Sequence, residues 1–440
     1  MNTLLVTVDA LRADHIFGYS RKTFPFLNEI GRGCKVRGTA YANGPNTISS
    51  VPSILTSSYQ GQNQAISGPT IGSVLQNNGI STAGFHSNTL LSNELGVIAG
   101  FNHFEDFGIT DDDTTSDSVS DNLLSFLYQA SQNPVVSPLR KAYDRLAPDH
   151  WFYNNSIYVD AKQKTDSVIQ WIENHQAEEW FVWVHYMDPH RPYGIDLGEP
   201  YFESMNVSNS EILRLMATAG QNPSDISQAQ REQIINLYDS DIRFLSQQLS
   251  RLVDFLKKED VWQGMNFLLT SDHGEEFGDH GKYFHRNLPY EELLEVPLLM
   301  KTSKPMSVQD EHDRQLIDIA PTICEIYDIS PPKDFEGRPL SKPKSYPHIA
   351  TGSFEGDDPT LAVRWKNWKY IYSGGQEELF DLSEDMKEVK SVLESNTEIG
   401  NTIREMVPTR LFSTGTESGS SVAEGTGEVR ERLKKLGYIE

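Results

Sequence analysis

Four short apolar runs recur along the chain, and each has the length of a strand that is buried on both faces. They are Leu4–Val8, Phe181–His185, Phe267–Thr270 and Val296–Met300. Between them, apolar residues recur at intervals of three and four, typical of amphipathic helices, over Ile71–Asn78, Asp160–Glu173 and Ile234–Lys257. This alternation predicts an α/β fold, with a central, mostly parallel sheet flanked by helices.

Toward the C-terminus the pattern changes from buried strands to a hairpin. Leu361–Trp365 and Trp368–Tyr372 are separated by two residues, the spacing of an antiparallel hairpin. The segment after Phe412 is rich in Ser, Gly, Thr and Glu, a composition typical of flexible chain. We therefore expect a large α/β domain over residues 1–345, a small antiparallel α+β subdomain over 346–400, and a flexible tail with a short terminal helix over 401–440.

Residues from about 110 to 155 have the composition of an insertion rather than of a core element. The segment opens on the acidic run Asp111-Asp112-Asp113 and then mixes helical spacing with three prolines. A long excursion of this kind is often a lid over a site. A solvated surface insertion explains the same composition, and the sequence leaves both interpretations open.

Composition limits what the chain can bind. Its 62 acidic and 38 basic side chains leave a net charge of −24, whereas a nucleic-acid-binding protein needs a basic face. We therefore expect no nucleic-acid partner. Two cysteines, Cys34 and Cys324, exclude a disulfide scaffold and leave room for one bridge.

The N-terminal segment indicates where the protein resides. Its apolar run is short, follows no basic residues, and ends in Asp9 rather than in a small-residue cleavage site. No stretch elsewhere approaches ~20 uninterrupted apolar residues, the length that spans a bilayer. We therefore expect neither a signal peptide nor a transmembrane helix, and a cytoplasmic location.

The sharpest cluster of polar residues follows the third apolar run. Asp272 and His273 enter a glycine-bounded loop that also carries Lys282 and His285. Oxygen and nitrogen donors side by side at a strand end suit a divalent metal. The competing interpretation is a polar loop in which His273 only caps backbone groups.

Two more runs end in polar residues. Asp9 closes the first run, where a partly buried charge needs compensation, either from a metal or from Arg12. His185, Asp188 and His190 lie within six residues at the end of the second run, and such a group can ligate a metal or hold an anionic substrate. Because functional groups of α/β folds collect beyond the carboxyl ends of strands, we expect these residues to meet.

A hydroxyl-rich segment begins at a turn formed by Gly44 and Pro45. Thr47 is expected to cap a helix that starts around Ser49 or Ser50. A hydroxyl at a helix N-terminus also lies where free amides and the helix dipole favour a developing anion. Taken by itself, capping is the simpler interpretation of Thr47.

Together these segments resemble the alkaline phosphatase/sulfatase superfamily, and its sulfatase branch in particular. They run in that family's order over roughly residues 1–390. The resemblance implies an alkaline-phosphatase-like fold and a metal-dependent ester hydrolase. The segments that carry it are Asp9–Asp14, Asn46–Thr56, Gly79–Asn88, Gly100–Phe104, His185–Tyr193, Ser271–His273, Tyr290–Glu292, Val296–Leu298, Asp318–Thr322, Glu336–Leu340 and Glu378–Leu382.

The resemblance also implies a metal site. It assigns one divalent cation to Asp9, Thr47, Asp272 and His273. Hard oxygen donors favour calcium, magnesium or manganese. A second site formed by Asp188, His190 and His285 would suit zinc, and the number of ions stays open.

Catalytic and substrate-binding roles follow from the same resemblance. Thr47 stands at the position of the nucleophile, and His285, with Lys282 behind it, is the candidate for protonating the leaving oxygen. Coordination to a dication would lower the pKa of the threonine hydroxyl and so activate it. The residues expected to bind the substrate are Asn46, Arg12, His185 and His190.

Two departures from the family pattern affect the expected chemistry. Formylglycine sulfatases carry Cys or Ser where this chain has Thr47, followed by Pro and Arg where it has Ser49 and Val51. Ala10 stands where many sulfatases have a second metal-binding Asp. Formylglycine formation is therefore not expected, whereas a metal-dependent ester hydrolase with a threonine alkoxide remains consistent.

These inferences predict a hydrolase of sulfuric or phosphoric esters, with a covalent threonyl intermediate. A phosphotransferase or phosphodiesterase of the same superfamily is an alternative, because it would share the covalent step. A catalytically silent, sulfatase-like binding protein is a third hypothesis. The substrate is expected to be a small-molecule, glycan-linked or lipid-linked ester, and the sequence does not indicate an oligomeric state.

Overall fold

The computed structural model describes most of the chain. The described residues are 1–30, 33–60, 68–88, 91, 96–97, 99–107, 159–195, 201–202, 207–307, 314–342, 347–352 and 359–412. The expected insertion at 110–155, and the tail beyond Phe412, lie outside these ranges.

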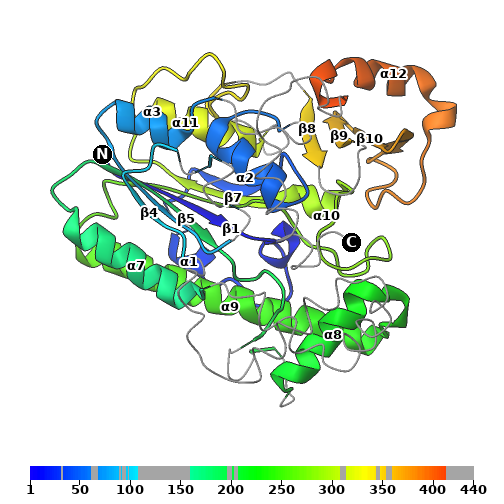
Figure 1. The fold of residues 1–440 in the computed structure, drawn as a ribbon, viewed down its shortest axis with the longest axis horizontal. Coiled ribbons are helices and arrows are strands. Elements are labelled where there is room, and N and C mark those ends of the chain that lie inside the picture. Colours follow the sequence, from blue (N-terminus) through cyan, green and yellow to red (C-terminus); the bar gives the residue numbers. More distant parts are fainter. Residues whose placement is uncertain are drawn as a thin grey trace, which may run out of the picture.

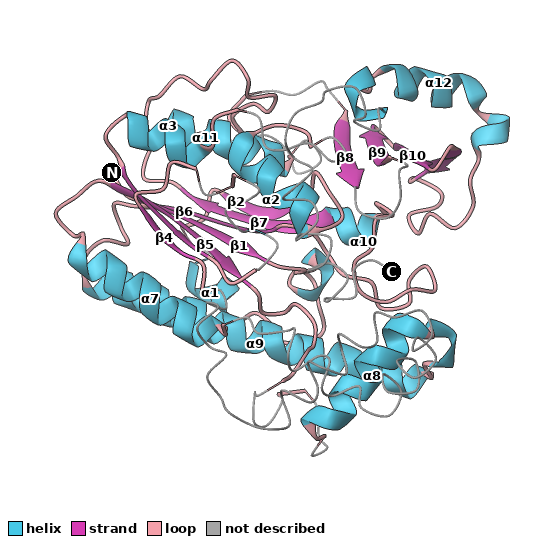
Figure 2. Ribbon diagram, in the orientation of Figure 1, coloured by secondary structure: helices cyan, strands magenta, loops and turns pink. Residues whose placement is uncertain are grey.

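A seven-stranded sheet forms the centre of the molecule, with the strand order β2-β7-β6-β1-β5-β3-β4 (Figure 2). All neighbours from β6 to β4 pair in parallel, whereas β7 is antiparallel to both β6 and β2. The sheet is therefore mostly parallel, as the sequence predicts. Its strands are β1 (Thr3–Val8), β2 (Val36–Tyr41), β3 (Ser81–Phe85), β4 (His103–Glu105), β5 (Trp180–Tyr186), β6 (Asn266–Ser271) and β7 (Glu295–Lys301).

Helices cover both faces of this sheet, with α1, α7 and α9 on one face and α2, α3 and α11 on the other (Figure 1). Two further helices, α8 and α10, lie toward the carboxyl ends of the strands. The bounds are α1 (Phe26–Ile30), α2 (Thr47–Thr56), α3 (Ile71–Asn77), α7 (Ala161–Asn174), α8 (Asn209–Gln221), α9 (Gln228–Lys258), α10 (Glu291–Leu294) and α11 (Ile319–Ile326).

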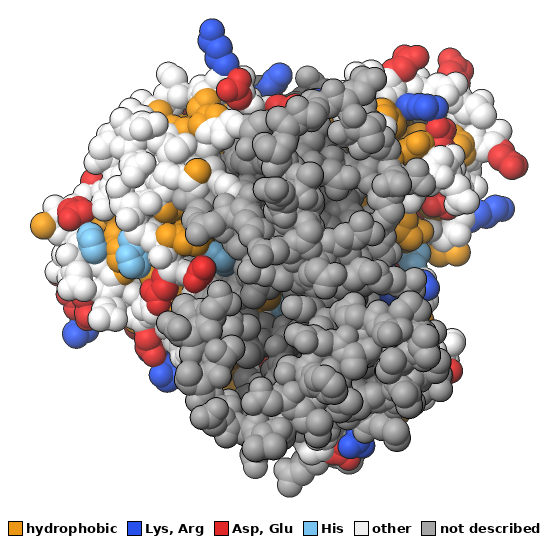
Figure 3. Space-filling view, in the orientation of Figure 1, with side chains coloured by type: hydrophobic (Ala, Val, Ile, Leu, Met, Phe, Trp, Pro, Cys, Tyr) orange, Lys and Arg blue, Asp and Glu red, His pale blue; other side chains and the backbone are white. Residues whose placement is uncertain are grey.

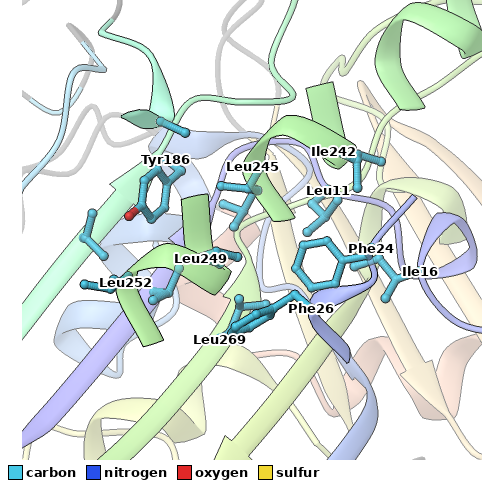
Figure 4. Close-up of a cluster of buried hydrophobic side chains, with 14 of the residues drawn as sticks. Leu11, Ile16, Phe24, Phe26, Tyr186, Ile242, Leu245, Leu249, Leu252 and Leu269 are labelled. Carbon is cyan, nitrogen blue, oxygen red and sulfur yellow. The ribbon is translucent and has the colours of Figure 1, made fainter. Parts of the chain in front are cut away.

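The two faces bury separate apolar cores because alternate side chains of each strand point to opposite sides. On the first face, the long helix α9 packs on β1, β5 and β6. Figure 4 shows Leu245, Leu249 and Leu252 of this helix facing Tyr186 of β5 and Leu269 of β6. This packing fixes the strand ends from which the polar residues project.

A second, four-stranded antiparallel sheet lies at the C-terminal end, with the order β11-β10-β9-β8. Its strands are β8 (His348–Gly352), β9 (Thr360–Trp365), β10 (Trp368–Ser373) and β11 (Gln376–Asp381). Helix α12 (Thr397–Glu405) and a 3₁₀ turn, η9 (Thr409–Phe412), add their apolar residues to the core of this sheet. The subdomain boundary expected at residue 400 falls inside α12, and the subdomain continues beyond it, because Ile403, Val407 and Leu411 are buried in its core.

The four apolar runs correspond to β1, β5, β6 and β7, and the three amphipathic stretches to α3, α7 and α9, so these predictions are confirmed. Cys34 and Cys324 are both free, so the bridge left open by composition is not formed. Among the described helices, none combines the length and the apolar character needed to cross a membrane. Acidic and basic side chains are interspersed at the margins of the face in Figure 3.

Candidate active site

Three neighbouring strands of the central sheet deliver polar residues to one point. Asp9 follows β1 and donates its amide to the Tyr186 carbonyl of β5 (2.8 Å), while the Asp272 amide beyond β6 donates to the Val8 carbonyl (3.1 Å). His185 pairs in register with Thr7 of β1. Because the three strands are adjacent and parallel, residues 9, 185 and 272 meet although they are far apart in sequence.

The turn after β1 is held from two sides, and it aims the Asp9 carboxylate inward. Ala10 has a left-handed backbone (φ 58°), which costs an alanine about 1–2 kcal/mol. Its amide donates to Asp272 Oδ1 (3.2 Å), and its carbonyl accepts from the Tyr238 hydroxyl of α9 (2.7 Å). Helix α9 and the Asp272 loop therefore hold this strained turn.

The helix that carries Thr47 starts earlier than predicted. Helix α2 begins at Thr47 itself, and Asn46 is its cap: Asn46 Oδ1 accepts from the Ser49 amide (3.1 Å) and the Ser49 hydroxyl (2.7 Å). The expectation that Thr47 caps a helix from Ser49 or Ser50 is therefore wrong. Because the asparagine amide group reaches the third helical residue, the Thr47 hydroxyl is not used for capping.

The Thr47 hydroxyl instead points into the polar cluster. It donates to Asp9 Oδ2 (3.1 Å) and lies 3.3 Å from His273 Nε2. The other ring nitrogen of His273, Nδ1, lies 2.8 Å from the Gly274 carbonyl, so Nδ1 carries the proton and Nε2 is left as an acceptor. His273 Nε2 is also 3.5 Å from Asp9 Oδ1 and 3.6 Å from Asp272 Oδ2.

These residues fit a divalent cation. Asp9 Oδ1, His185 Nε2 and Asp272 Oδ2 are buried, have no hydrogen-bond partner, and belong to three residues whose ligand atoms come within 4.8 Å of one another. Buried polar atoms normally have hydrogen-bond partners, so three such atoms without partners, close to one another, indicate a ligand site. Carboxylate oxygens with imidazole nitrogens are a donor set that divalent metals accept. His185 Nδ1, at 2.9 Å from the Thr7 hydroxyl, leaves Nε2 on the cluster side.

The charges of the two aspartates support the same interpretation. Burial first, and the neighbouring Asp9 carboxylate second, raise the pKa of Asp272 to about 8. Burial acts to raise the pKa of Asp9 as well, but His190, His185 and His273 together hold it below its usual range. Two buried carboxylates side by side resist double ionisation, and a bound dication would remove that conflict.

His285 lies beside this cluster, and it is oriented by a carboxylate. Its ring centroid is 4.3 Å from that of His273, and its Nδ1 is 3.2 Å from Glu275 Oε1. The Tyr193 hydroxyl donates to the other Glu275 oxygen at 2.6 Å. Burial first and His273 second lower the pKa of His285 well below its ordinary value, whereas Asp9 raises it.

The proposed ligands of a second metal are only partly brought together. His190 and His285 lie with ring centroids 5.2 Å apart. Asp188 is buried, which raises its pKa to about 7, and it interacts with the buried ammonium of Lys164. Lys164 Nζ donates to the His185 carbonyl (2.7 Å) and to the Ser87 hydroxyl (2.9 Å), so it supports the loop that begins at His185.

The other predicted site residues either contact different groups or are exposed. Arg12 is held by Asp14 (2.8 Å) and Asp279 (3.0 Å) and donates to the Glu275 carbonyl (2.8 Å), so its guanidinium links two loops. The Lys282 side chain is exposed. Asn46, besides capping α2, donates from Nδ2 to Asn287 (3.0 Å).

Sequence reasoning missed three residues of the site. Asn88 donates to Asp9 Oδ2 (3.1 Å), and the pair Glu275 and Tyr193 supports His285. Asn88 follows β3, so the strand-end rule that pointed to Asp9 could also have found it. Glu275 gave no such signal, because its partner Tyr193 lies 82 residues away in the sequence.

Comparison with known proteins places this site in a family context. The family model named Sulfatase matches residues 1–329. A choline-sulfatase from Rhizobium meliloti (strain 1021) is 24% identical over 271 residues, which are 55% of this chain and 52% of that protein. The phosphatidylethanolamine transferase Mcr-2 from Escherichia coli is 24% identical over 341 residues, 74% of this chain and 54% of that protein. The chain thus spans about half the length of these curated relatives.

A solved structure shares the fold of the described residues. The phosphonate monoester hydrolase of Agrobacterium radiobacter superposes with a TM-score of 0.64 at 16% sequence identity. The superposition covers 100% of this chain and 97% of the hydrolase. The alkaline-phosphatase-like arrangement of the two sheets is therefore shared.

Proposed function

The chain belongs to the sulfatase family, and we propose that it is a metal-dependent hydrolase of sulfuric or phosphoric esters that acts through Thr47. One observation carries this proposal. The Thr47 hydroxyl, at the first position of α2, lies 3.1 Å from Asp9 and 3.3 Å from His273, beside orphaned ligand atoms of Asp9 and Asp272. A hydroxyl so placed is a candidate nucleophile rather than a structural side chain.

Asp9, Asp272 and His273, with Thr47 and His185, would hold the cation. When bound, it would stabilise developing negative charge and lower the pKa of the Thr47 hydroxyl. Oxygen donors favour calcium, magnesium or manganese, and the additional imidazole of His185 moves the balance toward manganese or zinc.

In the first step, Thr47 enters as its alkoxide, having released its proton to water beforehand. Its Oγ1 attacks the sulfur or phosphorus atom, and the bond to the substrate's alcohol oxygen breaks. His285 Nε2 donates a proton to the departing oxygen, since Nδ1 faces Glu275. The amides at the start of α2 and the nearby His190 stabilise charge on the remaining oxygens. An anionic substrate would raise the pKa of His285 and so favour the protonated ring that this step needs.

In the second step, water cleaves the threonyl ester. His285, neutral after the first step, takes a proton from the attacking water and is again protonated for the next turnover, while the bond to Thr47 Oγ1 breaks and returns Thr47 as the alkoxide. The free sulfate or phosphate then leaves. Glu275 has a positioning role in both steps because it fixes which nitrogen of His285 faces the substrate.

The test crosses aryl sulfates, phosphate monoesters and phosphodiesters with calcium, magnesium, manganese and zinc. We expect one ester class to be turned over, Thr47→Ala to abolish turnover while metal binding is only weakened, and Thr47→Ser to retain part of it. Unchanged activity in Thr47→Ala would contradict the role of Thr47. If the wild type turns over none of these esters with any metal, the binding-protein hypothesis is favoured instead.

A transferase is the second candidate function, and one comparison favours it. The relative Mcr-2, a phosphatidylethanolamine transferase, aligns over 74% of this chain. A transferase would share the covalent step and pass the group from Thr47 to an alcohol instead of to water. Product analysis with added alcohols separates the two: a hydrolase releases inorganic sulfate or phosphate, whereas a transferase forms a new ester.

A further inference from the structure

A second group of candidate ligands lies outside the active site, on the loop that follows β6. Glu276, His280 and Glu292 present ligand atoms that all lie within 4.8 Å of one another. Glu276 and His280 come from the loop, and Glu292 comes from α10. The metal ligands and the catalytic residues proposed above include none of the three.

Close packing of the loop on α10 creates this group. Gly274 donates its amide to the Leu293 carbonyl (2.8 Å), and a Cβ at Gly274 would lie 1.9 Å from the Glu292 carbonyl oxygen. Only a glycine permits that approach. The loop is therefore held against α10, and this contact brings Glu276 and His280 to Glu292.

The imidazole of His280 is held through both ring nitrogens, and Nδ1 is paired with Glu292 in the position where it would bind a metal. Its Nδ1 faces Glu292 Oε1 (2.5 Å), while its Nε2 donates to the Lys387 carbonyl (3.0 Å). Its ring stacks on Tyr290 with centroids 3.6 Å apart and planes 7° apart. A backbone carbonyl that accepts from one nitrogen sets the other nitrogen toward a metal.

Glu276 provides a second, independent indication of a ligand. Its side chain is only 3% exposed, and no described residue donates a hydrogen bond to its carboxylate. Buried carboxylates are normally paired, because an uncompensated buried charge costs several kcal/mol. Glu292 is close enough to repel it, and His280 supplies at most one positive charge for the two carboxylates.

We propose that Glu276, His280 and Glu292 form a second cation site, which binds zinc or manganese and links the catalytic loop to α10. His280 Nδ1 and one oxygen of each glutamate are the ligands, and His280 Nε2 keeps its bond to Lys387. Two carboxylates with one imidazole suit these two metals better than calcium or magnesium. The site does not depend on Thr47 chemistry.

The position of the site gives it a structural consequence. The same loop carries Asp272 and His273 at one end and His285 at the other, while Lys387 precedes Glu388, which forms an ion pair with Lys369 of β10 (2.7 Å). A cation here would join the active-site loop to α10, which contacts the C-terminal sheet through the ion pair of Glu291 with Lys369 (3.0 Å). Its removal is expected to loosen the loop as well as to lower the unfolding temperature.

The experiment counts zinc in the full chain. Protein stripped with a chelator is reloaded with excess zinc, desalted and measured by plasma mass spectrometry, with the unfolding temperature recorded in parallel. We expect two zinc ions per chain in the wild type and one fewer in Glu276→Gln. In the Asp9→Asn/Asp272→Asn background, which removes the first site, we expect one ion, and none after Glu276→Gln is added.

Glu384→Gln is the matched control, because Glu384 is an exposed acidic residue of the C-terminal subdomain. It should leave the zinc count unchanged in both backgrounds. If Glu276→Gln loses no zinc in a folded protein, or if the double aspartate variant folds and binds none, the proposal is overturned. Should that double variant fail to fold, the comparison within the wild-type background decides.

Discussion

Glu275 shows how a single buried carboxylate can decide which nitrogen of a histidine does chemistry. It accepts from Tyr193 and faces His285 Nδ1, and it is fully buried. Burial raises the pKa of Glu275 to about 7, against the effects of Tyr193 and His273. Glu275 is therefore a positioning residue, since it acts through His285.

Replacing Glu275 tests that role. Glu275→Gln keeps the size of the side chain, but its amide can present nitrogen to His285 Nδ1 and so favour the wrong tautomer. We expect kcat to fall about 10–100-fold with a much smaller change in KM, the range found for residues that orient a ligand or catalytic histidine. Steady-state kinetics of Glu384→Gln, the same change at an exposed glutamate, serve as the control and should match the wild type.

Glu276 gives a prediction about pH. Burial first and Glu292 second raise its pKa to about 8 from 4.5. A group whose folded pKa is raised contributes stability below its unfolded pKa and loses it as the pH rises through the folded value. In chelator-treated protein the unfolding temperature should therefore fall between about pH 5 and pH 9, and Glu276→Gln should make that fall shallower. Equal slopes in the two proteins would contradict this.

At the scale of elements, the sequence predicted the strands that are buried on both faces. It did not predict which residues of distant segments contact one another. The four buried strands could be predicted because strands covered on both faces consist of continuous apolar residues. The edge strands β2 and β4 were not, because Arg37 and His103 interrupt their apolar pattern. Strand ends located Asp9, His185 and Asp272, whereas no local pattern shows that His185 faces Asp9 rather than the solvent.

The cap of α2 is the element on which the nucleophile depends. Both Asn46 and Thr47 are good capping residues, so the sequence could not decide between them. Asn46→Ala should remove the bond to the Ser49 amide, cost about 1 kcal/mol of stability, and lower kcat because the first turn of α2 carries Thr47.

Asn46→Ser is the matched variant, since a serine hydroxyl can cap the same amide. Chemical denaturation should show stability largely restored in this variant, and kinetics should show part of kcat regained. If Asn46→Ala is as active and as stable as the wild type, the cap does not position Thr47.

At the scale of the whole molecule, charge opposes the proposed chemistry. The chain carries a net charge of −24, and the proposed substrate is an anion. Long-range repulsion must therefore be overcome locally by the cation and by the histidines around it. Because exposed charges are screened over about 10 Å at 0.1 M salt and about 30 Å at 0.01 M, the repulsion depends on ionic strength.

Ionic strength should consequently raise the rate of capture. We expect kcat/KM for an anionic ester to increase several-fold between about 0.01 and 0.1 M of an inert salt, with kcat nearly constant. Initial-rate measurements with a chloride salt, at fixed metal concentration, check this. A fall in kcat/KM over that range would mean that local positive charge, and not the net charge, governs substrate approach.

A covalent intermediate at Thr47 would show that this residue is the nucleophile, and such an intermediate can be trapped. His285→Ala should slow hydrolysis of the threonyl ester, so an activated aryl ester that needs no protonated leaving group should load the enzyme. Rapid acid quenching, proteolysis and mass spectrometry would then locate the adduct. We expect one sulfuryl or phosphoryl group on the peptide that contains Thr47, at Thr47 itself, and none in Thr47→Ala. Turnover without any adduct, or an adduct on another residue, would contradict it.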